Sequence, residues 1–209
     1  METFMTFPKL LAFTGLAACL AVGTAQATII SGTGTFADTG STTNKLNFTG
    51  TVNNADITDL NLALGQTITF NDFLNIQATD TAAAFIGIAT RQDSIATNFT
   101  FTLPTAATGS VTGKGTDSTY SLAGDVFFSD GKIVWKNPTA IDFTDGAILS
   151  ISLANTTFIT GGTVAKDVDV AATFQLTKAP IPVPEPGSFL LLGTALAGLG
   201  LVLRRRTKA

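Results

Sequence analysis

The side chains best suited to chemistry in this 209-residue chain are aspartates that recur in close pairs. The pairs are Asp56 with Asp59, Asp125 with Asp130, Asp142 with Asp145, and Asp167 with Asp169. Two carboxylates flanking a glycosidic bond could act as acid and base in a glycosidase. Most of these aspartates lie in turn-like contexts such as Ser129-Asp130-Gly131, where Asp is favoured for its local backbone hydrogen bonds. Nothing marks the dry pocket that would raise one carboxyl pKa, so we expect a protein that is not an enzyme.

Other common catalytic chemistries are excluded by the residue types that the chain lacks. It contains no His and a single Cys. Without imidazole there is no Ser-His-Asp triad, no Cys-His pair and no His-ligated zinc or haem. One Cys cannot form an intrachain disulfide, nor can it ligate an iron–sulfur cluster by itself. We therefore expect no cofactor.

Calcium is the one metal ion that the aspartates could suit, because it takes carboxylate and carbonyl oxygens. No EF-hand loop or nonapeptide calcium repeat occurs, so a site would have to be assembled from separate loops. The best available ligands for such a site are Asp56, Asp59, Asp142 and Asp145. Solvated turn residues are the simpler interpretation, and no metal site is predicted.

The middle of the chain, residues 28–179, has the composition of a β domain. It holds seven basic residues and thirteen Asp but no Glu, which leaves a net charge of −6. Asp favours turns and caps, whereas Glu favours helix interiors. The abundant Thr, Val, Ile and Phe favour strands. The negative charge argues against nucleic acid as a partner, because phosphates require a basic surface.

Apolar and polar residues alternate along several segments, which is the period of a half-buried strand. The clearest segments run from Ile95 to Leu103, where Pro104 ends the pattern, and from Val168 to Leu176. Similar candidates are residues 46–52, 60–64 and 68–70. Strands at this spacing, with turn signals between them, predict an all-β fold with a β-sandwich or jelly-roll-like body.

Two Asp-Gly dipeptides predict tight hairpin turns, because both residues of a type I′ turn need a positive φ. Asp130-Gly131 would pair Val126 with Trp135, and Asp145-Gly146 would form a second hairpin. Trp135 and Tyr120 are aromatic types that often stack on sugar rings. Because Trp135 would lie opposite an apolar residue in the first hairpin, core packing is favoured over a sugar platform.

The N-terminus has the organisation of a secretory signal peptide. An apolar run from Leu10 to Val22 follows Lys9, and Ala25-Gln26-Ala27 supplies the small-x-small pattern that signal peptidase requires. We expect cleavage after Ala27. Leu16 to Cys19 also fits a lipobox, in which Cys19 would be lipidated, but the apolar run continues past it and favours an ordinary signal-peptide residue.

The C-terminus has three consecutive parts. Val183-Pro184-Glu185-Pro186 is followed by an uncharged stretch from Ser188 to Leu203, and then by Arg204-Arg205-Arg206. Sixteen helical residues would be about 24 Å long, so the helix would span the membrane only if the bilayer thins or the arginines snorkel. Basic residues after a transmembrane helix stay on the cytoplasmic side, which leaves the rest of the protein outside.

This tripartite tail resembles a PEP-CTERM sorting signal. Such signals are associated with exosortase, a membrane-embedded, transpeptidase-like enzyme of diderm bacteria that make extracellular polysaccharide. The resemblance implies recognition at Pro184-Glu185-Pro186, removal of the helix and basic tail, and transfer of the body to the cell surface or matrix. It covers about the last 27 residues and says nothing about the fold of the others.

The expected organisation is a signal peptide (1–27), a β-sandwich domain (28–179), a Pro-rich linker with the sorting motif (180–187), one transmembrane helix (188–203) and a basic cytoplasmic tail (204–209). We expect an exported, non-enzymatic protein of the cell surface or extracellular matrix. It would be held transiently in the inner membrane by its C-terminal helix and processed by an exosortase-type enzyme. The alternative is a module that binds extracellular polysaccharide, with or without the assistance of calcium.

Overall fold

The structure, a computed structural model, describes residues 27–40, 46–80, 87–122, 125–160, 166–181 and 192–199. Within these ranges the body contains β-strands and one 3-10 helix, η1 (Asn54–Ile57). The strands are β1 (Thr28–Asp38), β2 (Leu46–Val52), β3 (Leu60–Leu62), β4 (Thr67–Asp80), β5 (Gly87–Leu103), β6 (Ala107–Leu122), β7 (Asp125–Trp135), β8 (Thr139–Asp142), β9 (Ile148–Leu153), β10 (Thr156–Thr160) and β11 (Lys166–Lys178).

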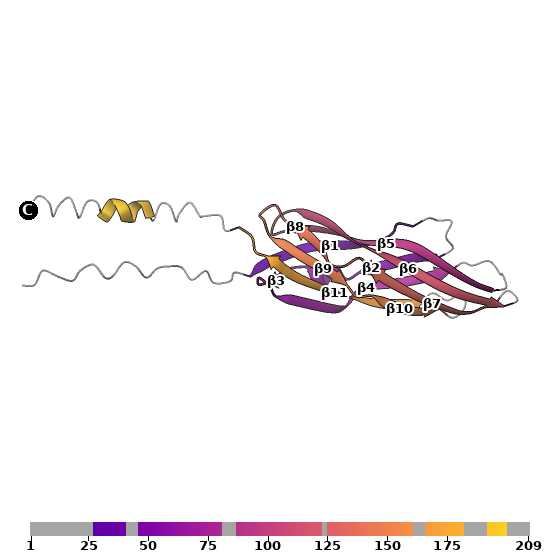
Figure 1. Cartoon of the computed structure of the whole chain (residues 1–209). Coiled ribbons are helices and arrows are strands. Elements are labelled where there is room, and N and C mark those ends of the chain that lie inside the picture. The colour runs from indigo at the N-terminus through magenta and orange to yellow at the C-terminus, as the bar shows by residue number, and fades with distance from the viewer. Residues whose placement is uncertain are drawn as a thin grey trace, which may run out of the picture.

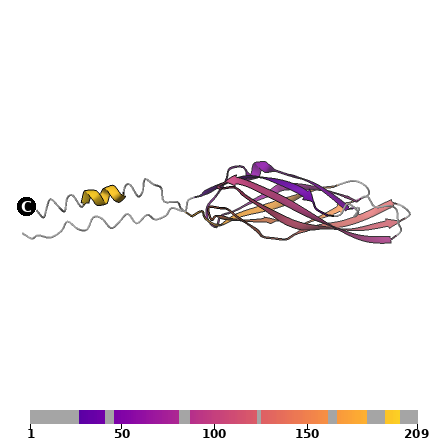
Figure 2. The ribbon, with the colours of Figure 1, turned by 90° about the horizontal axis from the view of Figure 1, so that it is seen from above.

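The strands form two sheets, as the prediction of a β-sandwich requires. One has the order β10-β7-β6-β5-β1-β3 and the other the order β2-β4-β11-β9-β8, and all the pairings are antiparallel. Figure 1 and Figure 2 show both sheets running along the long axis of a flattened body, with β3 and β8 at one end and β7 and β10 toward the other. The all-β prediction for the body is confirmed.

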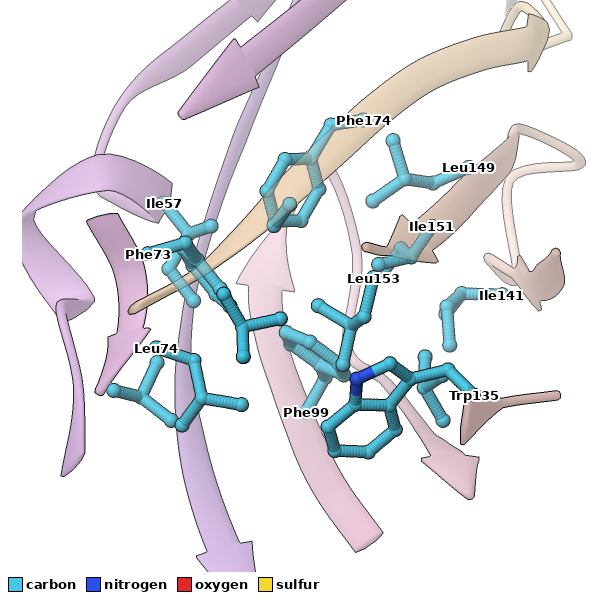
Figure 3. Close-up of a cluster of buried hydrophobic side chains, with 14 of the residues drawn as sticks. Ile57, Phe73, Leu74, Phe99, Trp135, Ile141, Leu149, Ile151, Leu153 and Phe174 are labelled. Atoms are coloured by element: carbon cyan, nitrogen blue, oxygen red, sulfur yellow. The ribbon is translucent and has the colours of Figure 1, made fainter. Parts of the chain in front are cut away.

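Alternating burial explains why these segments form strands. In β2 the apolar residues Leu46, Phe48 and Val52 are buried while their neighbours are not, and β11 repeats this pattern from Val170 to Leu176. Alternate side chains of a strand lie on the same face of its sheet, so each sheet has one apolar face, and the two faces pack together. Figure 3 shows the resulting core, in which Phe99 lies beneath a layer of aliphatic and aromatic side chains.

The hairpin predicted at Asp130-Gly131 is wrong. Both residues lie inside β7, which continues from Asp125 to Trp135 and pairs with β6 and β10 on its two sides. Gly131 is opposite Phe158 of β10, and a Cβ on Gly131 would overlap the Phe158 ring. This glycine therefore makes room for an aromatic ring from a neighbouring strand, and it does not form a turn.

A hairpin forms at Asp145-Gly146 as predicted, but it is not a two-residue type I′ turn, because Asp145 does not have a positive φ and the last strand pair is Asp142 with Ile148. Residues 143–147 connect β8 to β9, and Gly146 has a positive φ of 86°. The Phe143 N–H donates to the Ala147 carbonyl at 2.9 Å, which closes the turn. Glycine is needed here because a residue with a side chain is strained at this φ.

The two ends of the chain are described only in part. The predicted signal peptide lies outside the described residues except for Ala27, which is exposed and directly precedes β1. Of the predicted transmembrane segment the structure describes residues 192–199, which are helical. Within the described ranges, no helix combines the length and the apolar character that crossing a membrane requires.

We predict that Gly131→Ala destabilises the body. The added methyl group would have to displace the Phe158 ring, and overpacking of this kind typically costs about 1–3 kcal/mol. A loss of that size lowers the melting temperature by roughly 2–4 °C per kcal/mol in a chain of this length, which thermal denaturation would measure.

Gly193→Ala is the matched control, because a Cβ on Gly193 would meet nothing within 4 Å. Gly131→Ala made in a Phe158→Ala background should lower the melting temperature little, since the ring that the new methyl group would displace is gone. An equal loss in both backgrounds would show that the contact with Phe158 is not the cause.

Candidate functional site at the exit of the chain

The chain leaves the body next to the β8–β9 turn. The Ile181 N–H donates to the Asp145 carbonyl at 2.9 Å, and the side chain of Ile181 lies against Gly146. Because Gly146 has no side chain, the backbone of the turn and Ile181 can approach each other closely. Residue 181 is thereby attached to the body, although it follows the last strand by three residues.

The turn that holds Ile181 is itself fixed by side chains. Asp145 Oδ1 accepts a hydrogen bond from the Ala147 N–H at 3.1 Å, an arrangement typical of Asp in a turn. The Thr144 N–H donates to Thr105 Oγ1 at 3.1 Å, which connects this turn to the turn between β5 and β6. The exit of the chain is therefore held by both sheets.

The end of β11 is secured in the same region. Thr177 Oγ1 donates to the Ile148 carbonyl at 3.1 Å, and the Gly65 N–H donates to the Leu176 carbonyl at 2.7 Å. The body thus holds the chain in place as far as residue 181. This attachment lies beside the β8–β9 turn, at the end of the sandwich where β8 is labelled in Figure 1.

Comparison with known families places a sorting motif directly after this point. A family model for the PEP-CTERM protein-sorting motif matches residues 182–206. No curated protein and no solved structure matches the chain. The body is therefore a β-sandwich-like domain that carries a PEP-CTERM protein-sorting motif, and the resemblance stated from the sequence is confirmed.

The motif suggests sorting by an exosortase-type enzyme, with export and a destination at the cell surface. The matched segment contains Val183-Pro184-Glu185-Pro186 and Arg204-Arg205-Arg206, which the sequence singled out. These residues and Ala25 lie outside the part of the chain that the structure describes.

Three of the four aspartates considered for calcium lie in turns or at the end of a strand. Asp145 is part of the turn at the exit, and Asp142 is exposed at the end of β8. Asp59 has a positive φ of 55°, which Asp tolerates better than most residues, and its N–H donates to Ser31 Oγ at 3.4 Å. Within the described ranges, no group of three or more acidic, His or Cys side chains could hold a metal ion. We therefore propose no calcium site at these residues.

The structure brings together carboxylates that the sequence did not pair. Burial, together with the nearby Asp72 carboxylate, raises the pKa of Asp56. Asp93 lies near Asp38, close to the end of the β1–β5 ladder, where Asp38 is opposite Ile95. Neither contact could be found from spacing, because each joins residues on different elements of the fold.

Asp93 is the more strongly buried of these groups. Its side chain is 4% exposed, and its Oδ1 accepts a hydrogen bond from the Ser94 N–H at 2.8 Å. Burial raises the pKa of Asp93, the hydrogen bond from Ser94 opposes this, and the Asp38 carboxylate adds to it. Asp38 itself accepts hydrogen bonds from the Gly40 and Phe48 N–H groups at 3.1 and 3.0 Å. Asp38 thus links the end of β1 to β2, whereas the hydrogen bond of Asp93 is to the next residue along the chain.

Trp135 belongs to the core and cannot stack on a sugar. Its side chain is 4% exposed, and Figure 3 shows it beside Phe99, Leu153 and Ile141. A Cβ on Gly113 of β6 would lie 2.7 Å from the indole ring, so the ring also fills the space above that glycine. The expectation that Trp135 packs in the core is confirmed. The side chain of Tyr120 lies outside the described set.

We predict that Asp93→Asn raises the melting temperature at pH 7. A raised pKa means that the native state binds a proton more tightly than the unfolded chain does. Deprotonation of Asp93 therefore lowers the free energy of unfolding as the pH rises from the unfolded pKa of about 3.9 through the raised native pKa. Asparagine retains an oxygen for the Ser94 N–H and removes the charge.

The difference from the parent protein should shrink as the pH is lowered below about 3.9, because Asp93 is then protonated in both states. Thermal denaturation across this pH range measures the effect. Asp142→Asn serves as the control, because Asp142 is exposed and its exchange should change little at any pH. A Tm difference for Asp93→Asn that does not vary with pH would contradict the explanation.

Proposed function

We propose that this chain is an exported, non-enzymatic protein whose β-sandwich body is displayed at the cell surface or in the extracellular matrix. The observation that carries the proposal is the position of the sorting motif. The motif begins at residue 182, one residue after Ile181 is attached to the Asp145 turn. A processing enzyme at the membrane would therefore meet the motif outside the folded body.

The proposed route has three stages. The signal peptide directs export and is removed after Ala27. The apolar stretch from Ser188 to Leu203 then holds the protein in the inner membrane, with Arg204-Arg205-Arg206 on the cytoplasmic side. An exosortase-type enzyme cuts near Pro184-Glu185-Pro186, where the prolines keep the backbone extended and accessible. The body, freed of its tail, reaches the surface.

The chemistry of the body supports a role without catalysis. The chain has no His, and the Asp residues considered for catalysis include two that hold backbone groups or side chains in place. Asp145 Oδ1 accepts the Ala147 N–H within a turn, and Asp169 accepts a hydrogen bond from the Asn75 amide at 3.0 Å. Each of these carboxylates has a structural role.

A second candidate function is the binding of polysaccharide by the displayed body. A hollow on the six-stranded sheet favours it, because hydroxyl, amide and ammonium groups converge there without belonging to the core. Calcium need not take part, since the hollow contains no acidic residue.

We predict that the surface form of the protein ends near Pro184-Glu185-Pro186. Mass spectrometry of protein purified from the cell surface should find no peptide that contains Arg204-Arg205-Arg206. Glu185→Ala should leave the tail in place and retain the protein in the membrane fraction. Lys208→Ala is the control, because residue 208 lies beyond the matched segment. An intact tail on protein purified from the cell surface would contradict the proposal.

We also predict that the purified protein does not hydrolyse polysaccharide. Incubation with the polysaccharide of its own host should release no reducing ends above background. Asp56→Asn and Asp93→Asn, which change the two carboxyls of raised pKa, should be indistinguishable from the parent protein. Release of sugar that either exchange abolishes would establish a glycosidase instead.

A further inference from the structure

The outer face of the six-stranded sheet has a hollow of about 470 Å³ over β5, β6 and β7. We call it the lysine hollow. Its polar lining consists of Gln92, Thr112, Lys114, Thr116, Lys132 and Lys136. On β6 and β7 these side chains alternate with buried residues such as Val111 and Ile133, so they point away from the core. The hollow therefore lies on a solvent-facing surface.

Basic charge is concentrated in the lysine hollow. The body has seven basic residues against thirteen Asp, yet three of the seven line this one surface. Lys114 Nζ donates to Gln92 Oε1 at 3.1 Å, and no ion pair links any of the three lysines to another described residue. Among the side chains that the structure describes, none forms an ion pair with these three lysines, so their charges are available to an anionic ligand.

Strand pairing places the three lysines around one apolar side chain. Lys132 and Lys136 lie two residues to either side of Val134, and Lys114 is the partner of Val134 on β6. Lys136 directly follows the last residue of β7, and at the usual rise of a strand it is about 13 Å from Lys132. Val134 is 43% exposed in the middle. The result is an apolar centre with ammonium groups on three sides.

This arrangement suits an acidic sugar better than other polyanions. A uronate ring has an apolar C–H face, hydroxyl groups and a carboxylate, which match Val134, the threonines and the lysines respectively. Proteins that bind single-stranded nucleic acid stack the bases on exposed aromatic rings. The one aromatic residue that lines the hollow, Trp135, is only 4% exposed, so it provides no such stacking platform.

We infer that the lysine hollow binds an acidic polysaccharide, with Lys114, Lys132 and Lys136 contacting its carboxylate or sulfate groups. The inference rests on the proposed location at the cell surface, because there the body would meet such a polymer. Lys114 lies seven residues along β6 from Ala107, about 23 Å from the end of the body where the chain exits. Attachment through the C-terminus leaves the hollow uncovered.

The test is titration of the purified protein with oligogalacturonate. A neutral dextran oligomer of equal length, oligothymidylate and polyglutamate of equal charge are the comparison ligands. Binding to oligogalacturonate should be the tightest and should weaken as NaCl is added. Each of Lys114→Gln, Lys132→Gln and Lys136→Gln should weaken it by about two- to fivefold, and the triple variant by roughly tenfold or more.

Lys178→Gln is the matched control, because Lys178 is an exposed lysine on the other sheet. It should leave binding unchanged, and all variants should keep the melting temperature of the parent protein. Absence of binding, equal binding of dextran, tighter binding of oligothymidylate or polyglutamate, or an equal loss in Lys178→Gln would each overturn the inference. Cleavage of the tail is measured separately by mass spectrometry, so failure of polysaccharide binding would leave the proposed sorting route untouched.

Discussion

The packing of Phe99 between the two sheets is the contact on which the rest of the structure depends. Phe99 belongs to β5 of the six-stranded sheet, and its ring lies 6.1 Å from Phe73 and 6.4 Å from Phe174 of the five-stranded sheet. Aromatic pairs at these separations add to the hydrophobic effect of burial. Because a strand alternates its side chains, burying this face of β5 also turns Gln92 outward, toward the lysine hollow. The core thus decides which residues a ligand can reach.

Alternation was sufficient to predict several of the strands, because a period of two reports burial of one face whatever the partner strand is, but it did not locate β1 or β6. It located β2, β11 and the second half of β5. Trp135 is in the core as expected, although the hairpin from which that was inferred does not form. The local signal at Asp130-Gly131 was misleading for a physical reason. An Asp-Gly pair favours a turn in isolation, but Gly131 is required where Phe158 from β10 covers the strand. The local sequence around Gly131 does not predict a contact with a ring so distant in sequence.

The same limit applies to side chains that meet across the fold. The sorting motif could be recognised because its parts are contiguous in sequence. In contrast, the environment of Asp93 depends on Asp38, which the pairing of β1 with β5 brings near. The lysine hollow likewise needs the register that sets Lys114 opposite Val134. A sequence predicts the residue types of such sites, but pairing between strands decides which residues share a surface.

The distribution of charge over the body limits where an acidic polymer could bind. A body with a net charge of −6 is repelled by an acidic polymer over most of its surface. At physiological ionic strength, charges are screened beyond about 8 Å, so attraction is confined to the immediate surroundings of the three lysines. Repulsion is screened in the same way, so the inferred polymer would meet attraction only beside the three lysines and repulsion only close to exposed aspartates. Since the C-terminal exit lies at one end of the body and the hollow lies farther along β6 and β7, removal of the tail and binding of the polymer place no conflicting demands on the same surface.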